Sequence, residues 1–377
     1  MGLSVTLVAV CTLPLFLTGA LAPQLSEELR FTASGLGLAI AAYRVGAAAT
    51  VGVLGRLADR IGSTNGVRLA ATFTIVASLG IALTVRSLVG LIAWLLVGAL
   101  GRSLSQPAVN RLIVNRIPVR RQGTAFGVKQ SGGPSASMLA GLSVPLLAAT
   151  LGWRAAFIAA AVLAAVVILS VGKPTPRRTT VRAKRVARTP LRARRTLALL
   201  FLAFTVASGA SSVLTAFYVA SATSAGLSPG LAGTMLAAAS VVAITVRVTS
   251  GVASDRMPSG HLLLCAAMLL VGGFGTLALA TGVPWLMATG ILVGLAGSWG
   301  FDGVFWYAVV RRYHEQPGQV TGALEPGGLI GGAGTPLLFG LLVDLTSYQT
   351  AWIAGAVLAF LGAAAMLRGE QLLARSA

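Results

Sequence analysis

The stretch Gly55-Arg56-Leu57-Ala58-Asp59-Arg60 returns 196 residues later as Gly251-Val252-Ala253-Ser254-Asp255-Arg256. Two more anchors return at nearly the same offset: Gly132-Gly133 as Gly327-Gly328 after 195 residues, and Trp153 as Trp352 after 199. Several anchors at nearly one offset indicate that the chain consists of two homologous halves. In a membrane protein, two such halves are typical of transporters.

The composition indicates an integral membrane protein. Of the 377 residues, 56% are hydrophobic and only 10% are charged, whereas soluble domains carry about 25% charged residues. The formal net charge of +20 does not point to nucleic acid, because the basic residues cluster between 173 and 195 and in short loops between apolar runs. The two cysteines, Cys11 and Cys265, have neither metal-ligand nor disulfide spacing.

Twelve apolar runs are long enough to cross a bilayer as helices, which need about 20 residues each. The runs are 3–23, 33–54, 67–85, 88–115, 123–149, 153–171, 197–221, 229–253, 261–281, 284–311, 319–345 and 348–367. Basic residues collect in the loops on one side, so we expect both termini to face the cytoplasm.

These runs predict an all-α integral membrane protein built from two pseudo-symmetric six-helix bundles. The bundles are 1–172 and 197–377, and a basic cytoplasmic linker, 173–196, joins them. The preference for arginine over lysine, with much alanine and glycine, favours a bacterial origin. The expected location is therefore the bacterial plasma (inner) membrane, as a multi-pass protein.

The motif residues resemble those of the major facilitator superfamily of twelve-helix transporters. After helix 2, that family carries G-x-x-x-D-R-x-G-R-R, and this chain matches it at Gly55, Asp59, Arg60 and Gly62. The stretch Gly127–Pro134 is similar to the family's glycine-rich and proline-rich helix 5. The chain departs from the family at Ser63 and Thr64, which replace a basic pair, and at Trp94, which replaces an arginine early in helix 4.

The repeated stretch contains the candidate gating residues. An aspartate and an arginine at a helix end can form charge-assisted bonds with a neighbouring helix terminus. The resemblance implies that they close the cytoplasmic side as a latch. The candidates are Gly55, Asp59, Arg60, Asp255 and Arg256; the alternative is a turn that carries ordinary topology charges.

Charged residues within the apolar runs are the candidate substrate-binding residues, because each is costly in the bilayer unless it faces a cavity or a partner. Arg44, with Tyr43 beside it, lies near the middle of its run. The alternative for Arg44 is a bond to backbone carbonyls or to a distant acid. Arg102 and Gln106 are four residues apart on one helix face, and we expect them to bind substrate too.

A second group of candidates lies in the other half. Asp302 shares a helix face with Trp299 and Trp306, three residues before it and four after it. These aromatic residues predict contact with an organic substrate, unless they form an aromatic belt. Asp302 alternatively pairs with Arg102 or with Arg247, and Arg247 is itself a candidate anion ligand.

Glu325, Asp302 and Lys129 are the candidate proton-coupling residues. A membrane-buried carboxylate is a plausible proton carrier. Lys129 and Glu325 occupy neighbouring positions of the repeat, so we expect a pair that opens and closes during transport. The alternative is that both side chains reach to the membrane interface.

The sequence thus predicts a secondary active transporter that moves a small solute by alternating access. Cations outnumber acids inside the predicted spans, which favours proton-coupled symport of a small organic anion. The alternative is proton-coupled efflux of hydrophobic compounds, as in a drug exporter. We expect no enzyme activity, no catalytic residues, no cofactor and no metal, because nucleotide-binding and catalytic constellations are missing. The expected partners are the substrate, protons and lipid, and the expected functional state is a monomer.

Overall fold

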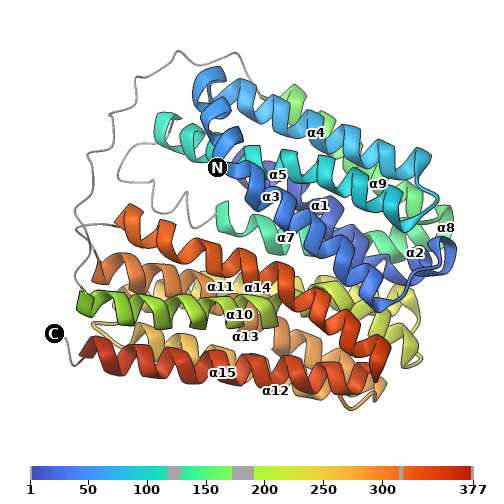
Figure 1. The fold of residues 1–377 in the computed structure, drawn as a ribbon. Helices are drawn as coiled ribbons and strands as arrows, with labels where there is room; N and C mark the ends of the chain where they lie inside the picture. The colour runs from blue at the N-terminus through green and yellow to red at the C-terminus, as the bar shows by residue number, and fades with distance from the viewer. Residues whose placement is uncertain (1, 117–128, 172–190, 314–316, 375–377) are drawn as a thin grey trace. The chain divides into compact units, whose positions relative to one another are not determined.

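The computed structural model describes residues 2–116, 129–171, 191–313 and 317–374, and every regular element in these ranges is helical (Figure 1). In chain order the elements are α1 (Gly2–Ala20), α2 (Ala22–Leu29), α3 (Ala33–Ile61), α4 (Ser63–Thr84), α5 (Leu88–Arg116), α7 (Gly132–Ser143), the π-helix η1 (Val144–Ala148), α8 (Ala149–Leu151), α9 (Trp153–Ser170), α10 (Leu191–Ser224), α11 (Pro229–Arg256), α12 (His261–Leu279), α13 (Pro284–Arg312), α14 (Pro317–Leu345) and α15 (Tyr348–Ala374).

Eleven spans are long and apolar enough to cross a membrane, and the bent pair α1 and α2 makes twelve if it is one span. This confirms the all-α membrane fold. The chain bends by 67° between α1 and α2. Since α2 carries Gln24, Glu27 and Glu28, we place it beyond the apolar part of the span. The first residues of the predicted run 123–149 lie outside the described part of the chain.

Single glycines make the tightest connections between helices. Gly62 alone links α3 to α4 with φ of 84°, and Gly152 links α8 to α9 with φ of 80°. A side chain at this positive φ is strained, so glycine is the residue that lets each helix end and the next begin at once. One consequence is that Gly55–Arg60 forms the last turns of α3 instead of a loop.

The chain forms two compact units. Unit 1 consists of Met1–Thr179 and Thr215–Val241, and unit 2 consists of Thr180–Leu214 and Val242–Ala377. An apolar core lies among α1, α3, α4, α5 and α9 in unit 1. A second core lies among α10, α12, α13, α14 and α15 in unit 2. The division into bundles 1–172 and 197–377 remains a prediction.

The same helix pairs pack in both halves of the sequence. α4 packs against α5 and α9, as α12 packs against α13 and α15 (Figure 1). A Cβ added at Gly132 of α7 would lie 2.6 Å from Val8 of α1. A Cβ added at the equivalent Gly327 of α14 would lie 2.6 Å from Thr205 of α10. The sequence repeat is therefore also a repeat of helix packing.

Small residues also join α7 to the first part of α11 within unit 1. A Cβ added at Gly141 would lie 2.6 Å from the carbonyl oxygen of Gly233. One turn away, the hydroxyl of Ser240 donates to that of Ser137 at 2.9 Å. Close backbone approach through small residues is how helices pack tightly in lipid.

Candidate functional site

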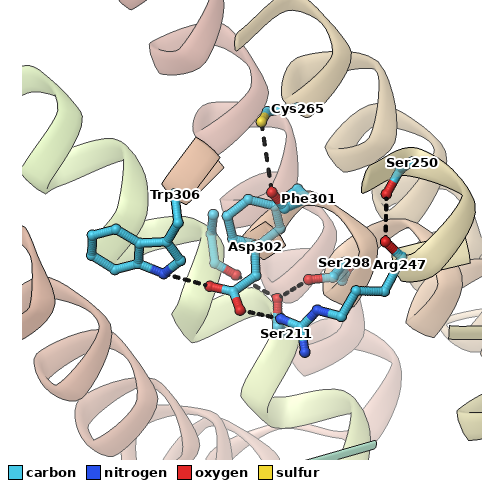
Figure 2. A network of polar contacts seen from close by, with 9 residues as sticks. Ser211, Arg247, Ser250, Cys265, Ser298, Phe301, Asp302 and Trp306 are labelled. Carbon is cyan, nitrogen blue, oxygen red and sulfur yellow. Dashed lines mark hydrogen bonds and ion pairs between the residues drawn. The ribbon is translucent and has the colours of Figure 1, made fainter. Parts of the chain in front are cut away.

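An ion pair joins α11 and α13 in unit 2. Arg247 donates through Nη2 to Oδ2 of Asp302, and Nε1 of Trp306 donates to Oδ1 of Asp302 at 3.1 Å (Figure 2). The side chains of Arg247 and Asp302 are only 12% and 24% exposed. Each of these charges would be costly alone, and each compensates the other. Of the two partners that the sequence left open for Asp302, the structure shows Arg247.

Polar and aromatic groups surround this pair. Ser211 of α10 donates to the carbonyl oxygen of Ser298 at 2.5 Å (Figure 2). Phe204 stacks on Phe305 with ring centroids 4.8 Å apart, and it meets Trp306 edge-on at 5.0 Å. The Asp302 carboxylate therefore lies next to aromatic residues of α10 and α13.

Two arginines lie close together between α3 and α5 in unit 1. The two helices meet where the hydroxyl of Ser103 donates to the carbonyl oxygen of Ala47 at 2.8 Å. Arg102 precedes Ser103 by one residue, and Arg44 precedes Ala47 by three. The charge of Arg102 acts on Arg44. Both arginines are half-buried. Among the described residues, Nε of Arg44 and Nη1 of Arg102 are buried without a hydrogen-bond partner.

The acids of unit 1 are too far away to neutralise this arginine pair. The sequence of unit 1 contains three acids, Glu27, Glu28 and Asp59. The two glutamates belong to α2, whereas Arg44 follows the start of α3 by eleven residues, or about 16 Å at 1.5 Å per residue. Asp59 follows Arg44 by fifteen residues in the same helix, or about 22 Å. Unit 1 therefore holds two positive charges, Arg44 and Arg102, that lie far along the chain from its three acids.

Lys129 adds a third cation to unit 1. It is buried, and its ammonium donates to Oδ1 of Asn110 at 2.8 Å. Asn110 follows Arg102 and the half-buried Gln106 on one face of α5. The stripe on α5 thus carries a cation at one end, and a neutral amide bonded to a second cation at the other.

The remaining candidates are placed as follows. The hydroxyl of Tyr43 donates to the carbonyl oxygen of Cys11 in α1 at 2.8 Å, so it joins two helices. Trp299 is half-buried on α13 and Glu325 is exposed on α14. The roles predicted for these three residues in binding or coupling remain predictions.

The predicted gating residues lie at the ends of α3 and α11. Arg60, Asp255 and Arg256 are exposed, and a Cβ added at Gly55 would meet no atom within 4 Å. The side chain of Asp59 lies outside the described part of the structure. The predicted gating role is compatible with exposed helix ends, and it remains a prediction.

Two residues at the start of α9 form a clamp on α2 that was not predicted from the sequence. Arg154 binds both carboxylate oxygens of Glu28 at 2.6 and 2.9 Å, and Nε1 of Trp153 donates to Glu28 at 2.6 Å. Arg154 also donates to the carbonyl oxygen of Val85 at 3.3 Å. Because Arg154 and Trp153 bind the charged carboxylate, they hold the pKa of Glu28 below its ordinary value near 4.5. The signal available in the sequence was an acid in a short polar segment and an arginine at the start of helix 153–171.

A many-helix membrane bundle with an internal repeat, small-residue crossings and charges inside its spans defines a class of membrane transporter. Comparison with known proteins agrees. The profile of the Major Facilitator Superfamily matches residues 5–334, and the chain belongs to this family. None of the curated proteins matches the chain.

Solved transporter structures share the fold. The chain is similar to a bacterial homolog of the human lysosomal transporter Spinster in an inward-facing and unoccupied conformation, with a TM-score of 0.76, 14% identity, and coverage of 99% of this chain and 97% of that chain. It is also similar to the nucleoside transporter NupG (TM-score 0.74, 15% identity, 97% and 99% covered). A D-xylose-proton symporter matches likewise (TM-score 0.75, 15% identity, 96% of each chain covered).

Proposed function

We propose that this protein is a proton-coupled symporter that carries a small organic anion across the plasma membrane by alternating access. One observation carries the proposal: Arg44 and Arg102 present buried, unpartnered nitrogens among the described residues of a unit that has no acid within reach. A protein retains such charges at a large energetic cost unless a ligand neutralises them. Planar guanidinium groups are suited to bind carboxylates and related anions.

Asp302 is the proposed proton acceptor. It is a partly buried carboxylate whose charge is held by Arg247 and whose other oxygen is bonded by Trp306. A proton on Asp302 would break the ion pair and free Arg247 to move or to bind an anion. Binding of a proton would in this way change the charge of α13 during the transport cycle. Glu325 is the second candidate.

Proton-coupled efflux of hydrophobic compounds is the competing function. The observation that favours it is the aromatic wall beside Asp302, made by Phe204, Phe305 and Trp306. In that case the aromatic rings would bind the cargo and Asp302 would still carry the proton. Arg44 and Arg102 would then have a structural role only.

The test is transport by the purified protein in proteoliposomes under an imposed inward proton gradient. A panel of small organic anions is compared with lipophilic cations, for the wild type and for R44Q, D302N and R86Q. Arg86 is exposed, so R86Q is a matched arginine control. We expect saturable, gradient-driven anion uptake that R44Q abolishes and R86Q retains. D302N is expected to keep anion exchange without a gradient, yet to lose accumulation driven by the gradient.

Two results would contradict the proposal. Movement of lipophilic compounds that survives R44Q would favour the exporter. Anion flux that rises linearly with concentration and ignores the proton gradient would exclude a coupled carrier.

A further inference from the structure

The charge balance of unit 1 restricts the number of negative charges on the transported anion. Arg44 and Arg102 each carry a guanidinium group, and together they bring two positive charges to this part of unit 1. Their charges act on each other, and the carboxylates of unit 1 lie in α2 or more than four turns along α3. A ligand with a single negative charge would leave one buried positive charge uncompensated.

The positions of the two arginines also restrict the size of the charged group. The helices meet at Ser103 and Ala47, with 2.8 Å between the hydroxyl and the carbonyl oxygen, and Thr50 reaches the same hydroxyl at 2.9 Å. Arg102 precedes Ser103 by one residue, and Arg44 precedes Ala47 by three. The unpartnered atoms, Nε of Arg44 and Nη1 of Arg102, come from both helices. One compact group can accept hydrogen bonds from both.

We propose that the substrate is a compact dianion, which places two negative charges together against Arg44 and Arg102. A phosphoryl group or two adjacent carboxylates supply this chemistry equally well. Two turns further along α5, Asn110 accepts a hydrogen bond from the ammonium of Lys129. This inference rests on the proposed function, since it specifies the charge of the anion that is carried.

The experiment measures binding directly, so that it does not depend on transport. The purified full-length protein is titrated calorimetrically with two matched pairs of compounds. Malonate is compared with malonamate, its singly charged monoamide, and methyl phosphate is compared with dimethyl phosphate. Each dianion is expected to bind about tenfold or more tightly than its monoanionic partner, because it satisfies one more charge-assisted bond. The two pairs distinguish a dicarboxylate from a phosphoryl group.

Variants test whether the two arginines recognise the second charge. R102Q and R44Q are each expected to reduce the tenfold preference to about twofold or less, while R86Q keeps it. Elution as a single peak and a melting temperature no lower than that of the wild type identify a folded variant. R102K, which keeps the charge and loses the planar fork, is expected to retain part of the preference.

The outcomes are distinguishable. A dianion preference that disappears in R102Q and R44Q supports the inference, for either compound pair. Equal binding of monoanions and dianions overturns the inference and leaves anion transport standing. A preference that persists in both variants overturns the assignment to these arginines. If lipophilic compounds bind and anions do not, the inference and the proposed function both fail.

Discussion

α5 of unit 1 and α13 of unit 2 are equivalent in the repeat, yet α5 carries a cation and α13 carries an acid that is paired with an arginine. Their equivalence follows from packing: a Cβ added at Gly101 would lie 2.8 Å from the carbonyl oxygen of Ala70, and one added at Gly297 would lie 2.3 Å from that of Met268. From these glycines the polar stripe of each helix continues. Arg102, Gln106 and Asn110 on α5 correspond to Ser298, Asp302 and Trp306 on α13.

The charged residues of the two helices have different partners. On α13 the acid is paired with Arg247 of the neighbouring helix, whereas the position equivalent to Arg247 in unit 1 is Val51. On α5 the charge of Arg102 acts on Arg44, and the acids of unit 1 lie in α2 and near the end of α3. Duplication supplied one scaffold twice, and the polar stripe then diverged. One copy pairs its charge with Arg247, and the other carries the two arginines that we propose bind the anion.

The largest effect is expected where the internal pair is broken. D302L removes the carboxylate that pairs with Arg247, which should lower the free energy of unfolding by about 3 kcal/mol. The double variant R247M/D302L should recover most of this loss, because no unpaired charge remains. Thermal unfolding in detergent, followed by size-exclusion chromatography, measures both. A double variant less stable than D302L would show that the pair is not the source of the effect.

The next largest effect concerns Gly101 of α5 and Gly297 of α13, which occupy equivalent positions of the repeat. G101A and G297A each force a methyl group against a backbone carbonyl, so each should destabilise its own unit by about 1–3 kcal/mol. G133A and G334A are the controls, because a Cβ at these positions meets nothing within 4 Å. The controls should be neutral or stabilising by up to about 1 kcal/mol, since alanine favours helix. If G101A and G297A differ widely in melting temperature, the packing equivalence is weaker than the geometry indicates.

The sequence was sufficient to predict the helices and the repeat, because apolar length and glycine spacing are local signals. It also identified Asp302 and Arg247 as charges inside the spans. It could not decide between Arg102 and Arg247 as the partner of Asp302, since pairing depends on which helices meet. Neighbouring positions on a helix point about 100° apart, so the adjacency of Tyr43 and Arg44 could not predict that the hydroxyl of Tyr43 bonds to the carbonyl oxygen of Cys11. The clamp between Glu28 and Arg154 joins residues 126 apart, beyond any local pattern.

A smaller effect, opposite in sign to that of D302L, is expected in unit 1. R102M removes one of two repelling charges that have no acid nearby, and it adds an apolar side chain. The ligand-free protein should therefore gain on the order of 1 kcal/mol of stability. Melting temperature in the absence of anions measures the gain, and a saturating dianion should stabilise the wild type more than R102M. A ligand-free R102M that melts well below the wild type would mean that Arg102 is paired within the protein.

The smallest expected effect concerns Trp153 and Trp352, which are equivalent in the repeat but have different partners. Trp153 and Arg154 bind the Glu28 carboxylate, whereas Trp352 packs on Phe339 with centroids 4.7 Å apart and is followed by Ile353. Because the pKa of Glu28 is lowered in the folded state, the clamp contributes fully above the ordinary value near 4.5. Its contribution is lost as the pH falls through the lower folded value.

Glu28 and Arg154 are 44% and 40% exposed, so solvent screening limits the contribution of the pair to about 0.5 kcal/mol. E28Q should therefore lower the melting temperature slightly at neutral pH and flatten its decline in acid. F339L, which disturbs the uncharged anchor of the other half, should shift the melting temperature by the same amount at every pH. If the acid sensitivity of E28Q equals that of the wild type, other carboxylates control it. The polar clamp would then add no pH dependence that the aromatic anchor lacks.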